Sequence, residues 1–494
     1  MNGNLPRLMR MAGLVALPLG LAACSALMPP DTSRPSDAPR SALASPPDQW
    51  QAPSPGAPGA PGVAAPAASD RLAAWWARWN DPVLDEWIAA AQSASPTVSA
   101  ARARLAQAEV ARANASASFL PTVDGSASGQ RGAQYPLPLS TIVQGGVQAR
   151  WELDLFGALR TQADAAEARV GAAQAQWHDA RVSVAAEVAQ QWTSLRACAE
   201  LLRNAEADSA SRGESARLSA IATRAGFVAS AADALAQAAA AQGRARVAQQ
   251  AGQCDAIVKG LAALTALPEG QIREKWRAVA VDRPQIAMFS VANPITALPA
   301  ETLEQRPDLA AAARAVEAAR ADVEQAERAH YPRLALSGQL GLGRARVAGN
   351  DLNLTTWLIG PLSLSVPIFD GGRRRAAEQG ARAAYEDAVL AYAAAVRRAV
   401  REVEDALVQL QSTARRSQEA ELVARQMAAH VSALQDKQRA GLASGLEVQE
   451  ARRNALGAEA AWIALQLERG TAWVQLYRAT GGGWSEAPRV VAGS

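Results

Sequence analysis

The sequence contains few of the residues that most enzyme sites use. It has three histidines and three cysteines in 494 residues, and only 5% of its residues are aromatic. The histidines, His178, His330 and His430, lie in separate helical stretches without metal-ligand spacing. Neither a nucleophile elbow nor a P-loop or dinucleotide fingerprint is present. We therefore expect no enzyme, no cofactor and no metal site.

Long apolar runs and a strong charge of one sign are also missing. No run of about 18 or more apolar residues occurs, so the sequence predicts no transmembrane helix. The net charge is only +3, so nucleic acid is not an expected partner. Abundant alanine with few aromatic residues favours long helices over a thick core.

The first residues read as a targeting segment. Arg7 and Arg10 precede an apolar stretch at 11–23 that is too short to span a bilayer. The stretch ends in Leu-Ala-Ala-Cys at Cys24, which resembles a bacterial lipoprotein signal and implies cleavage before Cys24 and its lipidation. The alternative is an ordinary signal peptide with a chance cysteine. Ser25 does not match the aspartate that retains lipoproteins on the inner membrane, so outer membrane lipid is the expected anchor site.

The remaining chain contains one unit twice, in the order helix, strand, strand, long helix, turn, long helix. After a signal peptide at 1–23 and a disordered Pro/Ser/Ala/Gly-rich tether at 24–69, the repeats occupy 70–298 and 299–480, with a tail at 481–494. Similar turns mark the two repeats, Arg-Ala-Gly at Gly226 and again at Gly441. The first repeat closes with a connector after residue 267 that suggests short strands.

Alternating apolar and polar residues predict four strands, at about 120–131, 143–156, 332–344 and 356–369. We expect Leu358, Leu362 and Leu364 to share one face. Each strand has the length of a tilted membrane-spanning strand. A soluble hairpin with one buried face is the alternative. Four strands leave open edges that lipid does not tolerate, so the chain must oligomerise. Three copies would give a twelve-stranded barrel with room inside.

Near-heptad apolar spacing predicts one long helix from Ala158 to about Arg224 and a second long helix that ends at about Arg439. Each would measure about 100 Å at the α-helical rise. Cys198 and Cys254 lie equally far in sequence from Gly226, so an antiparallel hairpin places them at the same height. This placement predicts a disulfide, and two buried thiols are the alternative.

The order of these features resembles the TolC family, most closely the lipoprotein (NodT-type) outer-membrane factors of tripartite RND efflux pumps. The residues that carry the resemblance are the lipobox at 21–24, Trp-Trp-Ala-Arg-Trp-Asn-Asp-Pro at 75–82, Glu-Gln-Arg-Pro-Asp-Leu at 304–309, Val-Pro-Ile-Phe-Asp-Gly-Gly-Arg at 366–373 and the turn region 441–453.

The resemblance implies a mainly α fold with transmembrane β strands. In this fold a homotrimeric twelve-stranded β-barrel in the outer membrane continues into a periplasmic α-helical barrel. It also implies passive efflux of drugs, metals or other small toxic compounds together with an inner membrane RND transporter. A periplasmic adaptor protein would dock at the turns, at Arg224, Gly226, Arg439 and Gly441. A type I secretion channel and a structural coiled-coil lipoprotein are the alternatives.

A gate is predicted just after the second turn. Leu442, Leu446, Glu450 and Arg453 have the spacing of one helical face. The two leucines would form apolar rings at the three-fold axis, and the two charges would form inter-helix ion pairs. These positions match the family's constriction and charged gate, although the family usually has Asp where Glu450 stands. Alternatively, the leucines pack inside the hairpin and the charges face solvent. The first turn is expected to carry Ala or Asp instead.

Overall fold

The computed structural model describes residues 81–133, 138–282, 303, 305–348 and 350–484. All of them belong to one compact unit, Pro46–Ser494. The expectations for the signal peptide, Cys24, the tether, Trp75 and most of the tail lie outside the described residues. Among the helices of the described part, none combines the length and apolar character needed to cross a membrane.

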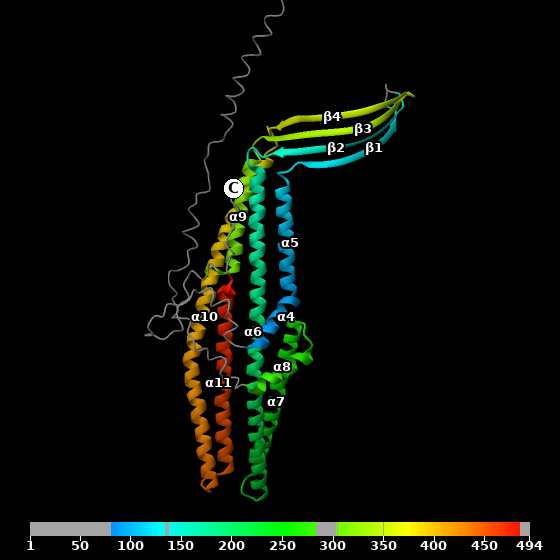
Figure 1. The fold of residues 1–494 in the computed structure, drawn as a ribbon. Coiled ribbons are helices and arrows are strands. Elements are labelled where there is room, and N and C mark those ends of the chain that lie inside the picture. Colours follow the sequence, from blue (N-terminus) through cyan, green and yellow to red (C-terminus); the bar gives the residue numbers. More distant parts are fainter. Residues whose placement is uncertain (1–80, 134–137, 283–302, 304, 349, 485–494) are drawn as a thin grey trace, which may run out of the picture. The chain divides into compact units, whose positions relative to one another are not determined.

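The described chain consists of two similar halves (Figure 1). The first half contains α4 (Pro82–Ala94), α5 (Pro96–Ala117), β1 (Thr122–Gly132), β2 (Ser140–Leu153), α6 (Ala158–Arg224), α7 (Ser230–Thr265) and α8 (Glu269–Asp282). The second half contains α9 (Pro307–Arg328), β3 (Arg333–Val347), β4 (Asn350–Ser365), α10 (Arg373–Arg439), α11 (Gly445–Ala479) and a 3-10 turn η4 (Gly481–Gly483).

The connector after α7 differs from its expectation. Its described part forms helix α8 rather than strands. Two ion pairs hold α8 against α7. Arg273 of α8 contacts Asp255 of α7 at 2.8 Å, and Lys259 of α7 contacts Glu269 of α8 at 3.1 Å. The remaining connector, 283–302, lies outside the described residues.

The four strands form one antiparallel sheet in the order β1-β2-β3-β4. The β3–β4 hairpin is tighter than expected, because pairing continues as far as Val347 and Asn350, where a loop was predicted. Asp351 supports this extension by binding Arg346 at 2.9 Å. β4 ends at Ser365 instead of near residue 369, just before the segment that contains Pro367, which lacks the N–H that a ladder needs.

The register collects apolar and small side chains on one face of the sheet. Across β2, β3 and β4, Trp151 lies opposite Leu336, which lies opposite Leu362. The same face carries Val123, Ala127, Val143, Val147, Leu153, Leu334, Leu340, Leu342, Trp357, Ile359 and Leu364.

The other face is mostly polar. It carries Thr122, Asp124, Ser126, Ser128, Gln130, Gln148, Arg150, Glu152, Ser337, Gln339, Thr356 and Ser363. The prediction that Leu358 shares a face with Leu362 is wrong. A register shift at the β3 segment Leu336–Gly338 adds one residue to β4 and turns Leu358 to the polar side.

Helix α6 is the common packing partner, since α4, α5, α7, α9 and α11 all contact it. Its tie to α4 is a buried polar cluster. The Asp81 carboxylate caps α4 by accepting the N–H groups of Val83 and Leu84. It also accepts hydrogen bonds from Trp192 Nε1 at 2.9 Å and from Arg196 Nη1 at 3.2 Å. Asp81 and Arg196 are both buried, and both carboxylate oxygens of Asp81 accept hydrogen bonds. Asp81 therefore fixes the residue at which α4 begins.

Candidate channel tips and gate

Both helical hairpins end in the same backbone motif. At the first tip, Gly226 has φ +78°, and the Phe227 N–H donates to the Ala222 carbonyl at 2.9 Å. At the second tip, Gly441 has φ +74°, and the Leu442 N–H donates to the Lys437 carbonyl at 2.8 Å. This is the Schellman motif, in which a glycine with positive φ closes the helix. The repeated Arg-Ala-Gly turns therefore have one structural role in both halves.

The residue after each glycine is apolar and projects into solvent. Phe227 is 86% exposed and Leu442 is 78% exposed. Leu235, behind the first tip, is also exposed. The expectation that the first turn carries only Ala or Asp at positions matching Leu442, Leu446, Glu450 and Arg453 is therefore wrong. Aligning the two glycines would have found Phe227 from the sequence, because it stands where Leu442 stands.

Leu442 does not lie on the helical face assigned to it. α11 begins only at Gly445, where Ser444 and Glu447 form a reciprocal capping box. Leu442 belongs to the Schellman turn before this cap, so its direction does not follow helical spacing. Leu446 lies on α11 and is 41% exposed. Within one chain, therefore, neither leucine is packed inside the hairpin.

A polar seam joins α11 to α6 close to the tips. Its contacts are Arg453 Nη1 to Ser215 Oγ at 2.8 Å, Ser211 Oγ to Gln449 Oε1 at 2.8 Å, and Asn204 Nδ2 to Glu459 Oε2 at 3.0 Å. Arg453 is thus held by Ser215 of the same chain. Glu450 is exposed, and within the described chain it forms no ion pair with Arg453. The sequence did not indicate the role of Ser215.

Beside this seam lies a groove of 380 Å³ between α6, α7 and α11. Its lining is rich in guanidinium and carboxamide groups, contributed by Asn204, Arg212, Arg246, Gln249, Gln253 and Arg453. Asp208 partly neutralises it, since its carboxylate contacts Arg212 at 2.7 Å. The two tips therefore have apolar ends and a polar, basic groove behind them.

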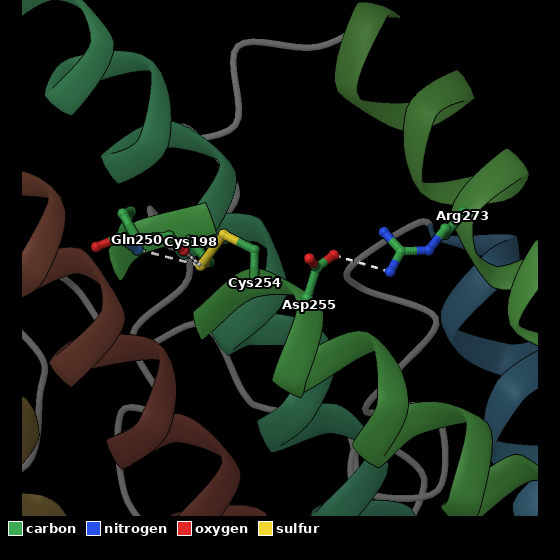
Figure 2. Close-up of a disulfide and its surroundings, with 5 residues drawn as sticks. All are labelled: Cys198, Gln250, Cys254, Asp255 and Arg273. Atoms are coloured by element: carbon green, nitrogen blue, oxygen red, sulfur yellow. Dashed lines mark hydrogen bonds and ion pairs between the residues drawn. A yellow bond between two sulfur atoms is a disulfide. The ribbon is translucent and has the colours of Figure 1, made fainter. Parts of the chain in front are cut away.

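A disulfide braces the first hairpin (Figure 2). Cys198 of α6 and Cys254 of α7 are bonded, with Cα atoms 5.7 Å apart. Both side chains are buried, at 4% and 2% exposed. Gln250 Nε2 donates to the Cys198 sulfur at 3.1 Å. Asp255, next to Cys254, holds Arg273 of α8, so the bond lies close to the contact between α7 and α8.

Replacing both Cys198 and Cys254 by alanine is expected to destabilise the hairpin by about 4 kcal/mol in the loop-entropy model. The unfolded chain would lose a crosslink, and the folded chain would lose two buried sulfur atoms. Thermal unfolding of the purified protein, followed by circular dichroism, measures the change. The control is the unmodified protein with its free thiols counted by labelling without reductant. Two reactive thiols there would contradict the disulfide.

Arg306, in the segment 304–309, ties three helices together. Its guanidinium is buried and contacts Asp308 of α9 and Glu402 of α10, and it donates to the Ala479 carbonyl of α11 at 2.7 Å. Burial alone would raise the pKa of Asp308, but the hydrogen bonds and charge of Arg306 outweigh it and hold that pKa below its ordinary value. Burial, followed by the negative charge of Asp308, raises the pKa of the nearby Asp179. This network is structural, and it explains why Arg306 and Asp308 stand at the start of α9.

Within the described ranges, no group of three or more His, Cys, Asp or Glu side chains could hold a metal ion.

The chain is similar to known proteins over most of its length. The model of the family described as outer membrane efflux protein matches residues 87–267 and 298–482. The chain is 30% identical over 495 residues to the pyoverdine export outer membrane protein OpmQ of Pseudomonas putida, covering 95% of this chain and 97% of that protein. It is 28% identical to nodulation protein T of Rhizobium leguminosarum bv. trifolii, covering 78% of this chain and 82% of that protein.

Among solved structures, the outer-membrane channel OprN is similar, with a TM-score of 0.73 and 28% identity over 87% of this chain and 99% of that chain. The TolC-like fold predicted from the sequence is confirmed by this similarity. The family match also confirms the prediction of an outer membrane channel of an efflux system. The family is one of channel proteins rather than enzymes. The chain therefore belongs to the outer membrane efflux protein family.

Proposed function

We propose that three copies of this chain form one conduit through the outer membrane, carrying small toxic compounds from an inner membrane pump to the exterior. The observation that carries the proposal is the open four-stranded sheet. Among the described residues, strands β1 and β4 each pair on one side only. Unpaired backbone groups in lipid cost several kcal/mol each, so each edge needs a strand from another copy. Three sheets give the twelve strands of the proposed homotrimeric barrel.

The two faces of the sheet support this arrangement. The apolar face, with Leu340 and Trp357, suits contact with lipid. The polar face, with Ser126 and Gln339, suits a water-filled lumen. A sheet of this kind in a soluble protein would bury its apolar face, but Leu340, Trp357, Ile359 and other members of that face are exposed in the single chain.

We further propose that the tips are where a periplasmic adaptor protein and, through it, an inner membrane RND transporter engage the channel. Arg224, Gly226, Arg439 and Gly441 shape the two turns, and Phe227 and Leu442 supply exposed apolar ends. Exposed apolar side chains on a rigid turn are suited to act as anchors in a partner's pocket. Leu446, Glu450 and Arg453 form the proposed gate, and Leu442 lies at its edge. The hydrogen bond between Arg453 and Ser215 stabilises the closed state of this gate.

Deleting the gene and measuring susceptibility to drugs and metals tests the function. We expect several toxic compounds to become more inhibitory, with recovery when the unmodified chain is supplied and no recovery with a chain lacking β4. Unchanged susceptibility together with loss of a secreted polypeptide would contradict drug efflux and favour a type I secretion channel. Lipidation is tested separately with Cys24→Ser. The mass of this variant, measured by mass spectrometry, should lack the contribution of the acyl chains.

A further inference from the structure

Aromatic side chains gather where the strands meet the helices. Trp151, near the end of β2, donates its Nε1–H to the Phe119 carbonyl at 2.8 Å. Phe156, in the turn before α6, stacks on Tyr331, in the turn before β3, with ring centroids 5.3 Å apart. Phe369 occupies the turn between β4 and α10. Aromatic residues concentrate at membrane–water interfaces, so in the proposed barrel this group marks the level at which the sheet leaves the bilayer.

Exposed arginines lie immediately beyond this aromatic group. The third residue of α6 is Arg160, and the third residue of α10 is Arg375; both are exposed, as is Arg373. None of the three guanidiniums forms an ion pair within the described part of the chain. Their neighbour Arg374 differs, because it contacts Asp370 at 2.8 Å. In both repeats, therefore, the first turn of the long helix carries arginine side chains that form no ion pair among the described residues.

These cations are poorly placed for helix stability. The N-terminal end of a helix carries a partial positive charge, so arginine in the first turn is unfavourable. At the C-terminal ends, where a positive charge is favourable, Arg224 lies in the last turn of α6 and Arg439 in the last turn of α10. A role outside the helix accounts for Arg160 and Arg375 better than a role within it.

We propose that Arg160, Arg373 and Arg375 form a basic collar that binds the phosphates of phospholipid headgroups in the periplasmic leaflet of the outer membrane. A guanidinium presents paired N–H donors that match phosphate oxygens. The collar begins where the lipid-facing sheet ends, and headgroups occupy that level of a bilayer. Ile368 and Phe369, which are 93% and 91% exposed, lie just before the arginines. The proposal places these two side chains against the acyl chains.

The occupant is a lipid rather than a protein because, resting on the proposed function, the collar continues the apolar face of the sheet that contacts lipid. Leu362 and Leu364 carry the apolar face of β4 to within a few residues of Ile368. An anionic headgroup complements the three positive charges, whereas a zwitterionic headgroup also brings a positive group close to them. The collar should therefore prefer phosphatidylglycerol to phosphatidylcholine.

The test uses the full-length channel in nanodiscs that contain phosphatidylcholine with one-fifth phosphatidylglycerol. Native mass spectrometry of the released channel counts the bound lipids of each class. We expect the preference for phosphatidylglycerol to fall by about fivefold per guanidinium removed, most in Arg160→Gln/Arg373→Gln/Arg375→Gln. The matched control is Arg397→Gln/Arg398→Gln, which removes two exposed arginines further along α10.

The control should keep the preference, and heat-modifiable trimers should persist in both variants. An unchanged preference in the collar variant would overturn the proposal. So would an equal loss per guanidinium removed in the control, since net charge alone would then explain binding. A collar variant that forms no trimers is replaced by the single variants Arg160→Gln and Arg375→Gln, for which the same two results decide.

Discussion

A channel carrying Arg453→Ala is expected to conduct ions at least tenfold more readily in a planar bilayer than the unmodified channel. The Arg453 guanidinium donates to Ser215 Oγ and joins α11 to α6 beside the tip. A hydrogen bond to a charged group contributes about 1.5–3 kcal/mol, and losing it shifts a closed–open equilibrium by about ten- to a hundredfold. Adding Glu450→Ala should raise conductance further if Glu450 pairs with a neighbouring copy.

The matched control is Arg452→Ala. Arg452 is the exposed neighbour of Arg453 and forms no ion pair among the described residues. Its loss should leave conductance unchanged. Ser215→Ala should reproduce most of the effect of Arg453→Ala, because it removes the acceptor of the same bond. Unchanged conductance in Arg453→Ala would contradict the gate, and an equal rise in Arg452→Ala would mean that pore charge, not the seam, sets conductance.

Replacing Phe227 and Leu442 by alanine together is expected to weaken adaptor binding more than thirtyfold. Both side chains project from rigid Schellman turns, so they can enter a partner's pocket with little loss of entropy. Truncating a buried aromatic or aliphatic anchor costs about 2 kcal/mol or more. Binding of the purified channel to a purified periplasmic adaptor protein from the same organism, measured by surface plasmon resonance, gives the change in Kd.

Gln237→Ala is the control for this second prediction, since it removes an exposed polar side chain from α7 behind the same tip. Its Kd should match that of the unmodified channel. Trimer formation and conductance of the Phe227→Ala/Leu442→Ala channel should also be normal, because neither side chain packs within its own chain. Unaltered adaptor binding in the double variant would contradict docking at the tips.

The sequence predicted the long helices more sharply than the strands. Gly157 and Gly226 flank α6, and a continuous apolar pattern lies between them, so both of its ends were readable. Alternation in β4 showed that a strand exists but not where pairing stops. That depends on cross-strand contacts such as Arg346 with Asp351, and on the register shift that turns Leu358 over.

The site was less predictable because its contacts cross between helices distant in sequence. Arg453 was identified as a gate residue, but Ser215 became visible only once α6 and α11 were packed together. Helical spacing alone places Leu442 on one face with Leu446, but the capping box of Ser444 and Glu447 starts α11 only after Leu442. The spacing of that capping box is readable in the sequence. Phe227 follows Gly226 as Leu442 follows Gly441, so its position at the first tip is readable from the sequence.

Crosslinking of the sheet edges tests the proposed conduit most directly. Ser126 of β1 and Thr356 of β4 both lie on the polar face, near the middle of the two edge strands. A chain with Ser126→Cys and Thr356→Cys, treated in outer membranes with a short bismaleimide, should give a denaturing-gel ladder of monomer, dimer and trimer. The single variant Ser126→Cys should give no such ladder. A ladder that stops at the dimer, continues beyond the trimer or fails to appear would contradict a barrel closed by three copies.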